Sequence, residues 1–269
     1  MCLIAVAWRS HPRWRLALIA NRDERHARPS APAGFDPEAA GVYGGRDLVQ
    51  GGGWLQASTR GRLAAVTNVR AGLEAEAAPR SRGWLVRDFV RGEADAGAFT
   101  DALSATAAGH GRFNLLVWDG GALAFATNHP AFAAGDVAPG LHAMSNGAFD
   151  AEWPKSMFAT HALAAWLDSA CAEAGDDDLP AAIEPLFAAL RDTTRAADTA
   201  LPDTGVGLAL ERALSPPFVL DERYGTRCSS IVLAGPEYLY FAERRFDAAG
   251  AAVGTSCVRL PFGGTARGG

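Results

Sequence analysis

The second residue of the chain, Cys2, has the side chain best suited to covalent chemistry. It follows Met1, and an initiator methionine that precedes a small side chain is normally removed. Removal leaves one residue with both a thiol and a free α-amino group, whose pKa of about 7.7–8.0 suits it to accept the thiol proton. Cys2 would then act as nucleophile and as base. The alternative is that Cys2 opens an apolar strand and is simply packed in the core.

The apolar runs on either side of Ser10–Arg13 predict a β-hairpin that begins with this cysteine. A turn at Ser10–Arg13 places Cys2 opposite Ala20 or Asn21 on the second strand. The Cβ atoms of residues paired across two strands lie roughly 4.5–5.5 Å apart. We therefore expect the residues that follow Ala20 to come within reach of the thiol.

Those residues are the polar run Asn21–Arg25, which emerges from the end of an apolar strand. Asp23 could hold a protonated α-amine in place, and Asn21 or Arg22 could steady an anion. The alternative interpretation is a solvated strand end with mixed charges.

Asn68 and Asn146 also end strand-like runs. A side-chain amide suits an oxyanion hole because it offers an N–H without a titrating charge. The pair Asn146-Gly147 is equally typical of an ordinary turn. The triple glycine at 51–53 lets the backbone approach a ligand closely, or it forms a flexible connection.

Four pairs of short apolar runs, each joined by a turn segment, predict β-hairpins and hence antiparallel sheets. The paired runs are Cys2–Trp8 with Trp14–Ala20, Trp54–Thr59 with Arg62–Val69, Phe113–Trp118 with Ala122–Asn128, and Ser229–Leu233 with Tyr238–Ala242. These runs are more continuously apolar than alternating, which indicates strands covered on both faces. Helical spacing of apolar residues predicts the covering helices at Arg80–Arg91, Ala96–Ala108, Pro154–Glu173 and Asp177–Arg191. The expected fold class is α+β, with two packed sheets and helices outside them.

Composition narrows the function classes. The 269 residues are 49% hydrophobic and carry a formal net charge of −5, and no run of Lys and Arg is present. This balance argues against a nucleic-acid partner. The N-terminal apolar run stops at Arg9 and no stretch is long enough for a membrane span, so we expect no stable membrane insertion. Four widely spaced cysteines favour a reducing, cytoplasmic location. We expect a single domain over residues 1–262 and a flexible tail at 263–269.

Short motifs in a fixed order along the chain resemble those of the Transport and Golgi organisation 2 family, also called the NRDE family after the tetrapeptide Asn21–Glu24. The matching segments are Met1–Ile4, Ala20–Glu24, Arg28–Ser30, Gly53–Leu55, Ser58–Gly61, Ala65–Asn68, Gly111–Leu115, Ser145–Asn146, Trp153–Lys155 and Tyr224–Arg227. The resemblance covers almost the whole chain.

The NRDE family is in turn similar to N-terminal-nucleophile (Ntn) hydrolases of the bile-salt hydrolase and penicillin V acylase type. This resemblance implies an Ntn-hydrolase-like αββα four-layer sandwich with two mainly antiparallel sheets. It implies Cys2 as nucleophile and base and Asp23 as the residue that positions the amine. It also implies oxyanion or substrate-binding roles for Asn68 and Asn146, and an arginine, Arg227, near the thiolate.

One position departs from the hydrolase pattern. The hydrolases have an arginine immediately before the asparagine of the second strand, where this chain has Ala20, and Arg22 is a candidate substitute. We assign substrate binding to Asn21, Arg22, Trp54 and His129.

Two functions follow from the resemblance. The first is hydrolysis of an amide, ester or thioester with an acyl portion, which requires no cofactor. The second is a non-catalytic carrier of haem, or of an acyl lipid, on the same fold. The six histidines show no ligand spacing, and only His26 and His129 lie near predicted strand ends. No metal site is expected. A purely structural, partner-binding role is a third hypothesis.

Overall fold

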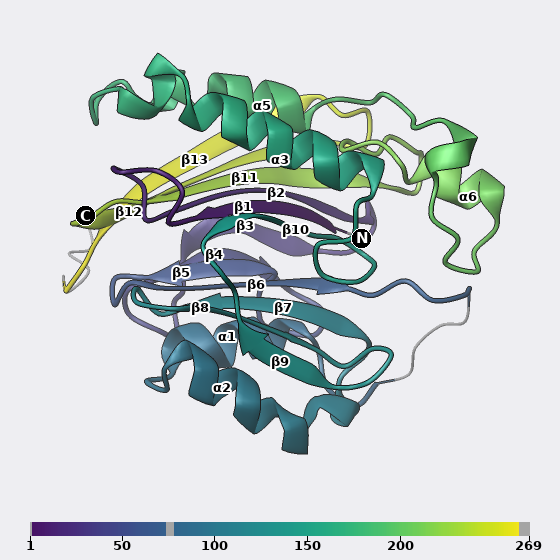
Figure 1. Cartoon of the computed structure of the whole chain (residues 1–269), viewed down its shortest axis with the longest axis horizontal. Coiled ribbons are helices and arrows are strands. Elements are labelled where there is room, and N and C mark those ends of the chain that lie inside the picture. The colour runs from purple at the N-terminus through teal and green to yellow at the C-terminus, as the bar shows by residue number, and fades with distance from the viewer. Residues whose placement is uncertain (1, 74–77, 264–269) are drawn as a thin grey trace.

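The computed structural model describes residues 2–73 and 78–263, apart from the side chain of Cys2, and stacks them in four layers. Helices cover one sheet, a second sheet packs beneath it, and further helices cover the second sheet (Figure 1). This confirms the predicted αββα sandwich. The predicted tail lies outside the described residues, except for Gly263.

The upper sheet in Figure 1 has the strand order β10-β1-β2-β11-β12-β13 among the described residues, and every neighbouring pair is antiparallel. Its strands are β1 (Cys2–Trp8), β2 (Leu16–Arg25), β10 (Gly140–Met144), β11 (Tyr224–Ala234), β12 (Tyr238–Phe246) and β13 (Ala252–Pro261). We call it sheet A.

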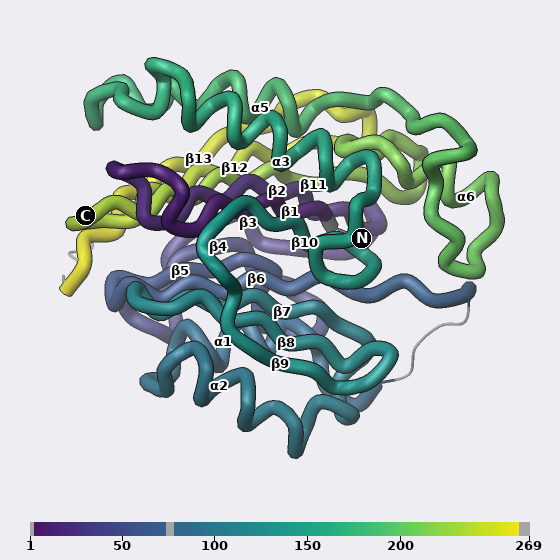
Figure 2. The backbone as a smooth tube through the Cα atoms, in the orientation of Figure 1, coloured from purple at the N-terminus to yellow at the C-terminus, as the bar shows by residue number. Residues whose placement is uncertain are grey.

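The lower sheet, sheet B, runs in sequence order from β3 to β9 and is also antiparallel throughout its described strands. Its strands are β3 (Ser30–Phe35), β4 (Val42–Asp47), β5 (Leu55–Ser58), β6 (Arg62–Asn68), β7 (Phe113–Trp118), β8 (Leu123–Thr127) and β9 (Ala133–Asp136). The colour ramp of Figure 2 shows that the chain leaves sheet A after β2, builds sheet B, and returns to sheet A with β10.

The helices are shorter than the apolar spacing predicts. They are α1 (Gly83–Arg91), α2 (Ala96–Ala102), α3 (Pro154–Leu167), α4 (Leu179–Ala182), α5 (Glu184–Leu190) and α6 (Leu208–Ala213), with 3₁₀ turns at Leu103–Ala105, Ala107–Gly109, Ala170–Glu173 and Asp198–Ala200. The predicted helix at 177–191 is two helices, because Pro185 lacks the N–H that a continuous helix needs and instead lies in the first turn of α5.

All four predicted hairpins are present, as β1–β2, β5–β6, β7–β8 and β11–β12. The register predicted for the first was wrong: Cys2 pairs with Arg22, not with Ala20 or Asn21. The turn is longer than expected, since Trp8 pairs with Leu16.

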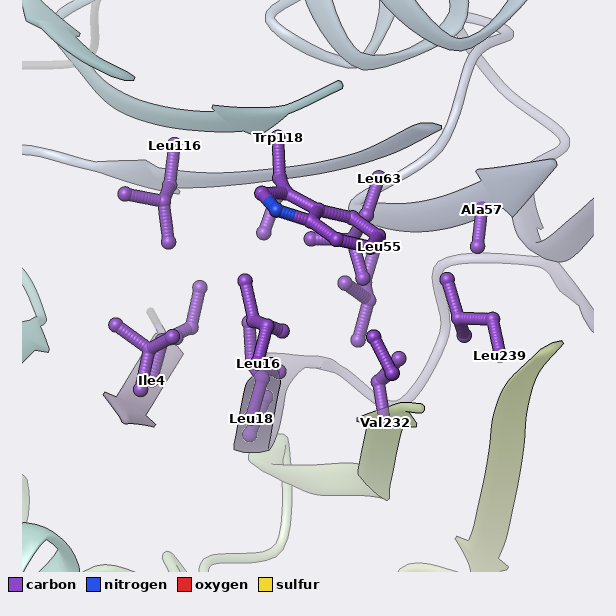
Figure 3. Close-up of a cluster of buried hydrophobic side chains, with 14 of the residues drawn as sticks. Ile4, Leu16, Leu18, Leu55, Ala57, Leu63, Leu116, Trp118, Val232 and Leu239 are labelled. Atoms are coloured by element: carbon purple, nitrogen blue, oxygen red, sulfur yellow. The ribbon is translucent and has the colours of Figure 1, made fainter. Parts of the chain in front are cut away.

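Three apolar clusters hold the layers together, one between the sheets and one on the outer face of each sheet. Between the sheets, Leu18 and Val232 of sheet A face Leu63 and Trp118 of sheet B (Figure 3). Each such side chain is fully buried and contributes about 1.5–3 kcal/mol relative to exposure. Burial on both faces explains why these strands read as continuous apolar runs.

No helix within residues 2–73 or 78–263 combines the length and apolarity needed to cross a membrane.

Candidate active site

A cleft of about 450 Å³ opens where β2 runs past the core between the sheets. Its described lining comes from the end of β2, from β4 and β6 with the loops beside them, and from the segment that leads into α1. The lining includes Arg22, Asp23, Trp54 and Asn68, four of the residues that the sequence analysis assigned to catalysis or substrate binding.

Strand alternation decides which residues of β2 reach the space between the sheets. Leu18 and Ala20 belong to the core between the sheets, whereas Ile19 belongs to the core under the helices. Arg22 has the same parity as Leu18 and Ala20, so its side chain also points into the space between the sheets. Its backbone pairs with Cys2 on one side and with Cys228 on the other, so β2 separates the two cysteine positions.

Asp23 is a buried carboxylate at this end of the sheet, with 2% of its surface exposed. Its Oδ1 accepts a hydrogen bond of 2.7 Å from Thr226 Oγ1, and its backbone carbonyl accepts one of 2.9 Å from the Tyr224 hydroxyl. Burial raises the pKa of the Asp23 carboxyl, and the charge of Lys155 and the bond from Thr226 act against that rise. Both the polar run at the end of β2 and the resemblance predict a role for Asp23, but nothing in the sequence marks Thr226 as its partner.

Asn68 and Asn146 are brought together across the two sheets. Nδ2 of Asn146, which is fully buried, donates to the backbone carbonyl of Asn68 at 2.9 Å and to its Oδ1 at 3.1 Å. Because Oδ1 of Asn68 accepts this bond, its Nδ2 is the end of the amide left for another partner, and it makes no hydrogen bond to a described residue. Asn68 lines the cleft. We therefore expect Asn68 to donate to a ligand and Asn146 to orient it.

The turn that carries Asn146 is tied to sheet B. The Ser145 carbonyl accepts a hydrogen bond of 2.6 Å from Thr67 Oγ1, and the Gly147 carbonyl accepts one of 2.6 Å from Asn114 Nδ2. Both donors lie in motifs that carry the family resemblance, although the sequence gave no sign of this bridging role.

Arg22 is a buried cation stacked on an aromatic ring. Its guanidinium carbon lies 4.2 Å from the centre of the Trp54 ring, and only 7% of the residue is exposed. Nη2 lies 3.7 Å from Glu24 Oε2, while Nη1 has no hydrogen-bond partner among the described residues. The indole fits because residue 45 is glycine: a Cβ there would come within 2.0 Å of the Trp54 ring.

The lining is rich in charge. It contains five arginines and three acidic residues from the described part of the chain, namely Arg22, Arg25, Arg28, Arg80, Arg82, Asp23, Glu24 and Asp47. Arg28 is held against Asp47 by two hydrogen bonds of 3.2 and 2.5 Å. The surplus of positive charge favours an anion in the cleft. Arg80, Arg82 and Asp47 line the cleft although no pattern in the sequence predicted it.

At one wall of the cleft, glycine allows the 51–53 loop to pack directly against the start of α1. A Cβ on Gly52 would lie 2.2 Å from the carbonyl oxygen of Gly83, at the start of α1, and Gly52 has a φ of +78°. The triple glycine therefore permits a close approach of the 51–53 loop to α1.

Three of the assigned residues lie elsewhere. Asn21 points into the helical layer, where its Nδ2 donates to the carbonyls of Leu190 and Pro217, each at 2.8 Å. Its position one residue before Arg22 puts it on the opposite face of β2. His129 lies between β8 and β9 and is not part of the cleft lining.

Arg227 is the third. It sits at a bulge in β11 between the pairs Thr226–Asp23 and Cys228–Arg22. Its Nη1 donates to the carbonyls of residues 25, 26 and 28 at 3.1, 3.1 and 3.2 Å, and it does not line the cleft. Arg227 therefore holds the loop between β2 and β3.

Haem does not fit this cleft well. A porphyrin needs broad apolar walls, but the described lining is mainly charged and polar, with Trp54 and Val66 its largest apolar side chains. The described lining contains no histidine or methionine. The described residues also contain no group of three or more His, Cys, Asp or Glu side chains placed to hold a metal ion.

Comparison with known proteins gives the family. A family model described as Transport and Golgi organisation 2 matches residues 1–248. The chain belongs to this family. The Transport and Golgi organization protein 2 homologs of Homo sapiens and Bos taurus are 29% and 30% identical to it, and each alignment covers 91% of this chain and 92% of the relative.

Solved structures of Ntn hydrolases have a fold similar to that of this family member. The conjugated bile acid hydrolase from Clostridium perfringens superposes with a TM-score of 0.51 over 96% of this chain and 92% of its own, at 7% identity. A penicillin V acylase from Agrobacterium tumefaciens gives a TM-score of 0.47 at 12% identity, covering 89% and 82% of the two chains. The superposition on the bile acid hydrolase shows that this member of the Transport and Golgi organisation 2 family has the Ntn-hydrolase fold.

Proposed function

We propose that the protein is an N-terminal-cysteine hydrolase acting on an amide, ester or thioester with an acyl portion. Once Met1 is removed, the α-amine of Cys2 takes the thiol proton and the thiolate attacks the acyl carbonyl. A sulfur–carbon bond forms, the bond to the leaving group breaks, and the leaving group takes the proton from the amine. Water then attacks the acyl-enzyme in the reverse sense, which releases the acid and restores the thiol.

The buried carboxylate of Asp23 carries this proposal. It lies on β2 beside the ladder position of Cys2, lines the cleft, and is held by Thr226. A carboxylate taken out of water is costly unless a cation or hydrogen-bond donors compensate it. The hydrogen bond from Thr226 and the charge of Lys155 offset part of that cost, and a protonated α-amine on the neighbouring strand would add to them.

Two further features support the chemistry. The Nδ2 of Asn68 is suited to donate to the oxyanion that forms on the acyl carbonyl. Arg22, opposite Cys2 in the ladder, supplies a positive charge that would lower the pKa of the thiol. We take the cytoplasmic location, where thiols stay reduced, as part of the same proposal.

The proposal is tested by hydrolysis of a panel of acyl p-nitroanilides, p-nitrophenyl esters and acyl thioesters of increasing chain length. We expect turnover of at least one class by the wild type and none by Cys2→Ala. Cys257→Ser is the matched control, because Cys257 is exposed on β13 and should be dispensable. Equal turnover by wild type and Cys2→Ala would refute a catalytic thiol.

A further inference from the structure

A second, smaller opening of about 120 Å³ lies on the other side of the Arg22–Trp54 stack. Arg22 and Trp54 line both this opening and the main cleft, so the stack is the partition between them. The remaining walls come from β3 and from the ends of β11, β12 and β13. Of the residues that the proposed function uses, Arg22 lines this opening, whereas Asp23 and Asn68 do not.

A buried carboxylate faces this opening. Glu243 of β12 is 1% exposed, and its Oε1 accepts a hydrogen bond of 2.7 Å from the Ala33 backbone N–H. Oε2 has no hydrogen-bond partner among the described residues. Burial raises the pKa of the carboxyl. The hydrogen bond from the Ala33 N–H, a hydrogen bond from the Cys228 side chain, and the charges of Arg245 and Arg22 act against that rise.

A buried guanidinium lines the same opening. Nη1 of Arg22 is also without a hydrogen-bond partner among the described residues. No direct ion pair between Arg22 and Glu243 occurs among the described contacts. Arg227 and Arg245 add positive charge to the wall, although Arg227 Nη1 is bound to loop carbonyls and Arg245 Nη1 donates to Ser256 Oγ at 2.8 Å.

The opening therefore has an unused donor on the Arg22 guanidinium and an unused acceptor oxygen, Oε2, on the Glu243 carboxyl, and both residues are nine-tenths buried or more. Buried polar atoms without partners are rare in folded proteins and call for an explanation. A simple anion would satisfy only the guanidinium, and a simple amine only the carboxylate. A small molecule with an anionic and a cationic end would satisfy both.

We propose that this opening is a binding site for a small α-amino acid, with its carboxylate on Arg22 and its ammonium group on Glu243. The volume limits the ligand to a small side chain. Phe246, Val253 and Pro32 provide an apolar wall for that side chain. Because the Arg22–Trp54 stack is shared, an amino acid bound here contacts the partition of the main cleft.

The test is calorimetric titration of glycine and L-alanine into the Cys2→Ala protein, so that binding is measured without any catalysis. Acetate and methylamine, which each carry one of the two charges, are titrated in parallel. We expect saturable binding of the amino acids and at least tenfold weaker binding of both single-charge probes. The proposal is overturned if the folded protein binds neither amino acid at concentrations up to about 10 mM, because a weaker site would contribute almost no binding free energy.

Two charge-removing variants locate the site. Glu243→Gln keeps an oxygen for the Ala33 N–H, and we expect it to weaken glycine binding at least tenfold; Arg22→Gln should do the same. Glu184→Gln and Arg244→Gln are the matched controls, since this ion pair does not line the opening and Arg244 stacks on Phe187 of the helical layer, and they should change the Kd less than twofold. Melting temperatures confirm that each variant is folded.

Two other outcomes would also contradict the amino-acid site. Acetate binding as tightly as glycine would replace the proposal with a simple anion site. Unchanged glycine binding in a folded Glu243→Gln protein would contradict it as well. Neither result bears on the hydrolase proposal, which rests on Cys2 and Asp23.

Discussion

Asp23 and Thr226 form the smallest unit of the candidate site. The hydroxyl donates to the carboxylate at 2.7 Å, and this bond lowers the pKa of Asp23 against the rise caused by burial. In the proposed mechanism only the ionised carboxylate holds the protonated amine. Activity should therefore fall as the pH drops through the raised pKa of Asp23.

Two substitutions test this role. Asp23→Asn should reduce kcat/KM by roughly 10²–10⁴-fold, the usual range for a group that supports proton transfer. Thr226→Val should move the acid limb of the pH–rate profile to higher pH, because a stabilising bond to the carboxylate is lost. Thr226→Ser retains the hydroxyl and is the control. An acid limb that stays in place in Thr226→Val would show that Asp23 does not set it.

Residue-level patterns in the sequence identified part of the site. Asp23, Asn68, Arg22 and Trp54 all reach the cleft. Asn21 does not, because its amide is bound to the carbonyls of Leu190 and Pro217 in the helical layer. The long connection between β1 and β2 shifted the register, which a sequence pattern could not reveal.

At the scale of single elements, the Trp54 ring packs so closely against β4 that residue 45 has to be glycine. The Trp54 ring occupies the space where residue 45 would carry a Cβ. Gly45→Ala should therefore displace Trp54 from Arg22 and destabilise the protein by about 1–3 kcal/mol, measured by urea unfolding. Gly135→Ala in β9 is the control, because a Cβ there meets nothing within 4 Å. Equal unfolding midpoints for the two variants would contradict this packing.

A histidine–aspartate pair, His142 and Asp150, joins β10 to the turn that follows it. His142 Nδ1 lies 2.7 Å from Asp150 Oδ2, and this hydrogen bond raises the pKa of His142 above its usual 6.5. A raised histidine pKa contributes stability below about pH 6.5, and that contribution is lost as the pH rises through the raised value. Because 44% of the Asp150 side chain is exposed, the contribution should be small, roughly 0.5 kcal/mol.

Asp150→Asn isolates this contribution, since the amide oxygen can still accept from the Ala143 N–H. The unfolding free energy of the variant should fall below that of the wild type at pH 5.5 and approach it at pH 9. A difference of the same size at both pH values would mean that the pair is not ionic.

Elements were predictable where burial on two faces gives long apolar runs, as in β1, β2, β7 and β11. The sequence does not predict the strands β3 and β4, because their apolar pattern is interrupted by proline and glycine at Pro32, Gly34, Gly44 and Gly45. Their pairing depends on tertiary contacts, which lie beyond local propensity.

At the scale of the whole molecule, a buried ion pair joins the segment after β6 to α6. Arg70 Nη2 lies 2.5 Å from Glu211 Oε2, with 7% and 3% of the two side chains exposed. Removal of one partner leaves a buried charge uncompensated, so Glu211→Gln should cost about 3 kcal/mol of unfolding free energy. Asp198→Asn breaks the exposed pair with Arg212 and should have no measurable effect. Similar losses in both variants would contradict the distinction between buried and exposed pairs.

The layered fold brings the ends of β2 and β6 to one cleft, and Asn146 in the turn after β10 bridges to Asn68 of sheet B. The central claim is that Cys2 becomes the N-terminus and accepts an acyl group there. Peptide mass mapping of protein isolated from its natural host, before and after a brief acid-quenched incubation with an acyl thioester, tests it most directly. The N-terminal peptide should begin at Cys2 and gain the mass of the acyl group. A peptide that retains Met1, or that stays unmodified while the substrate is consumed, would contradict the claim.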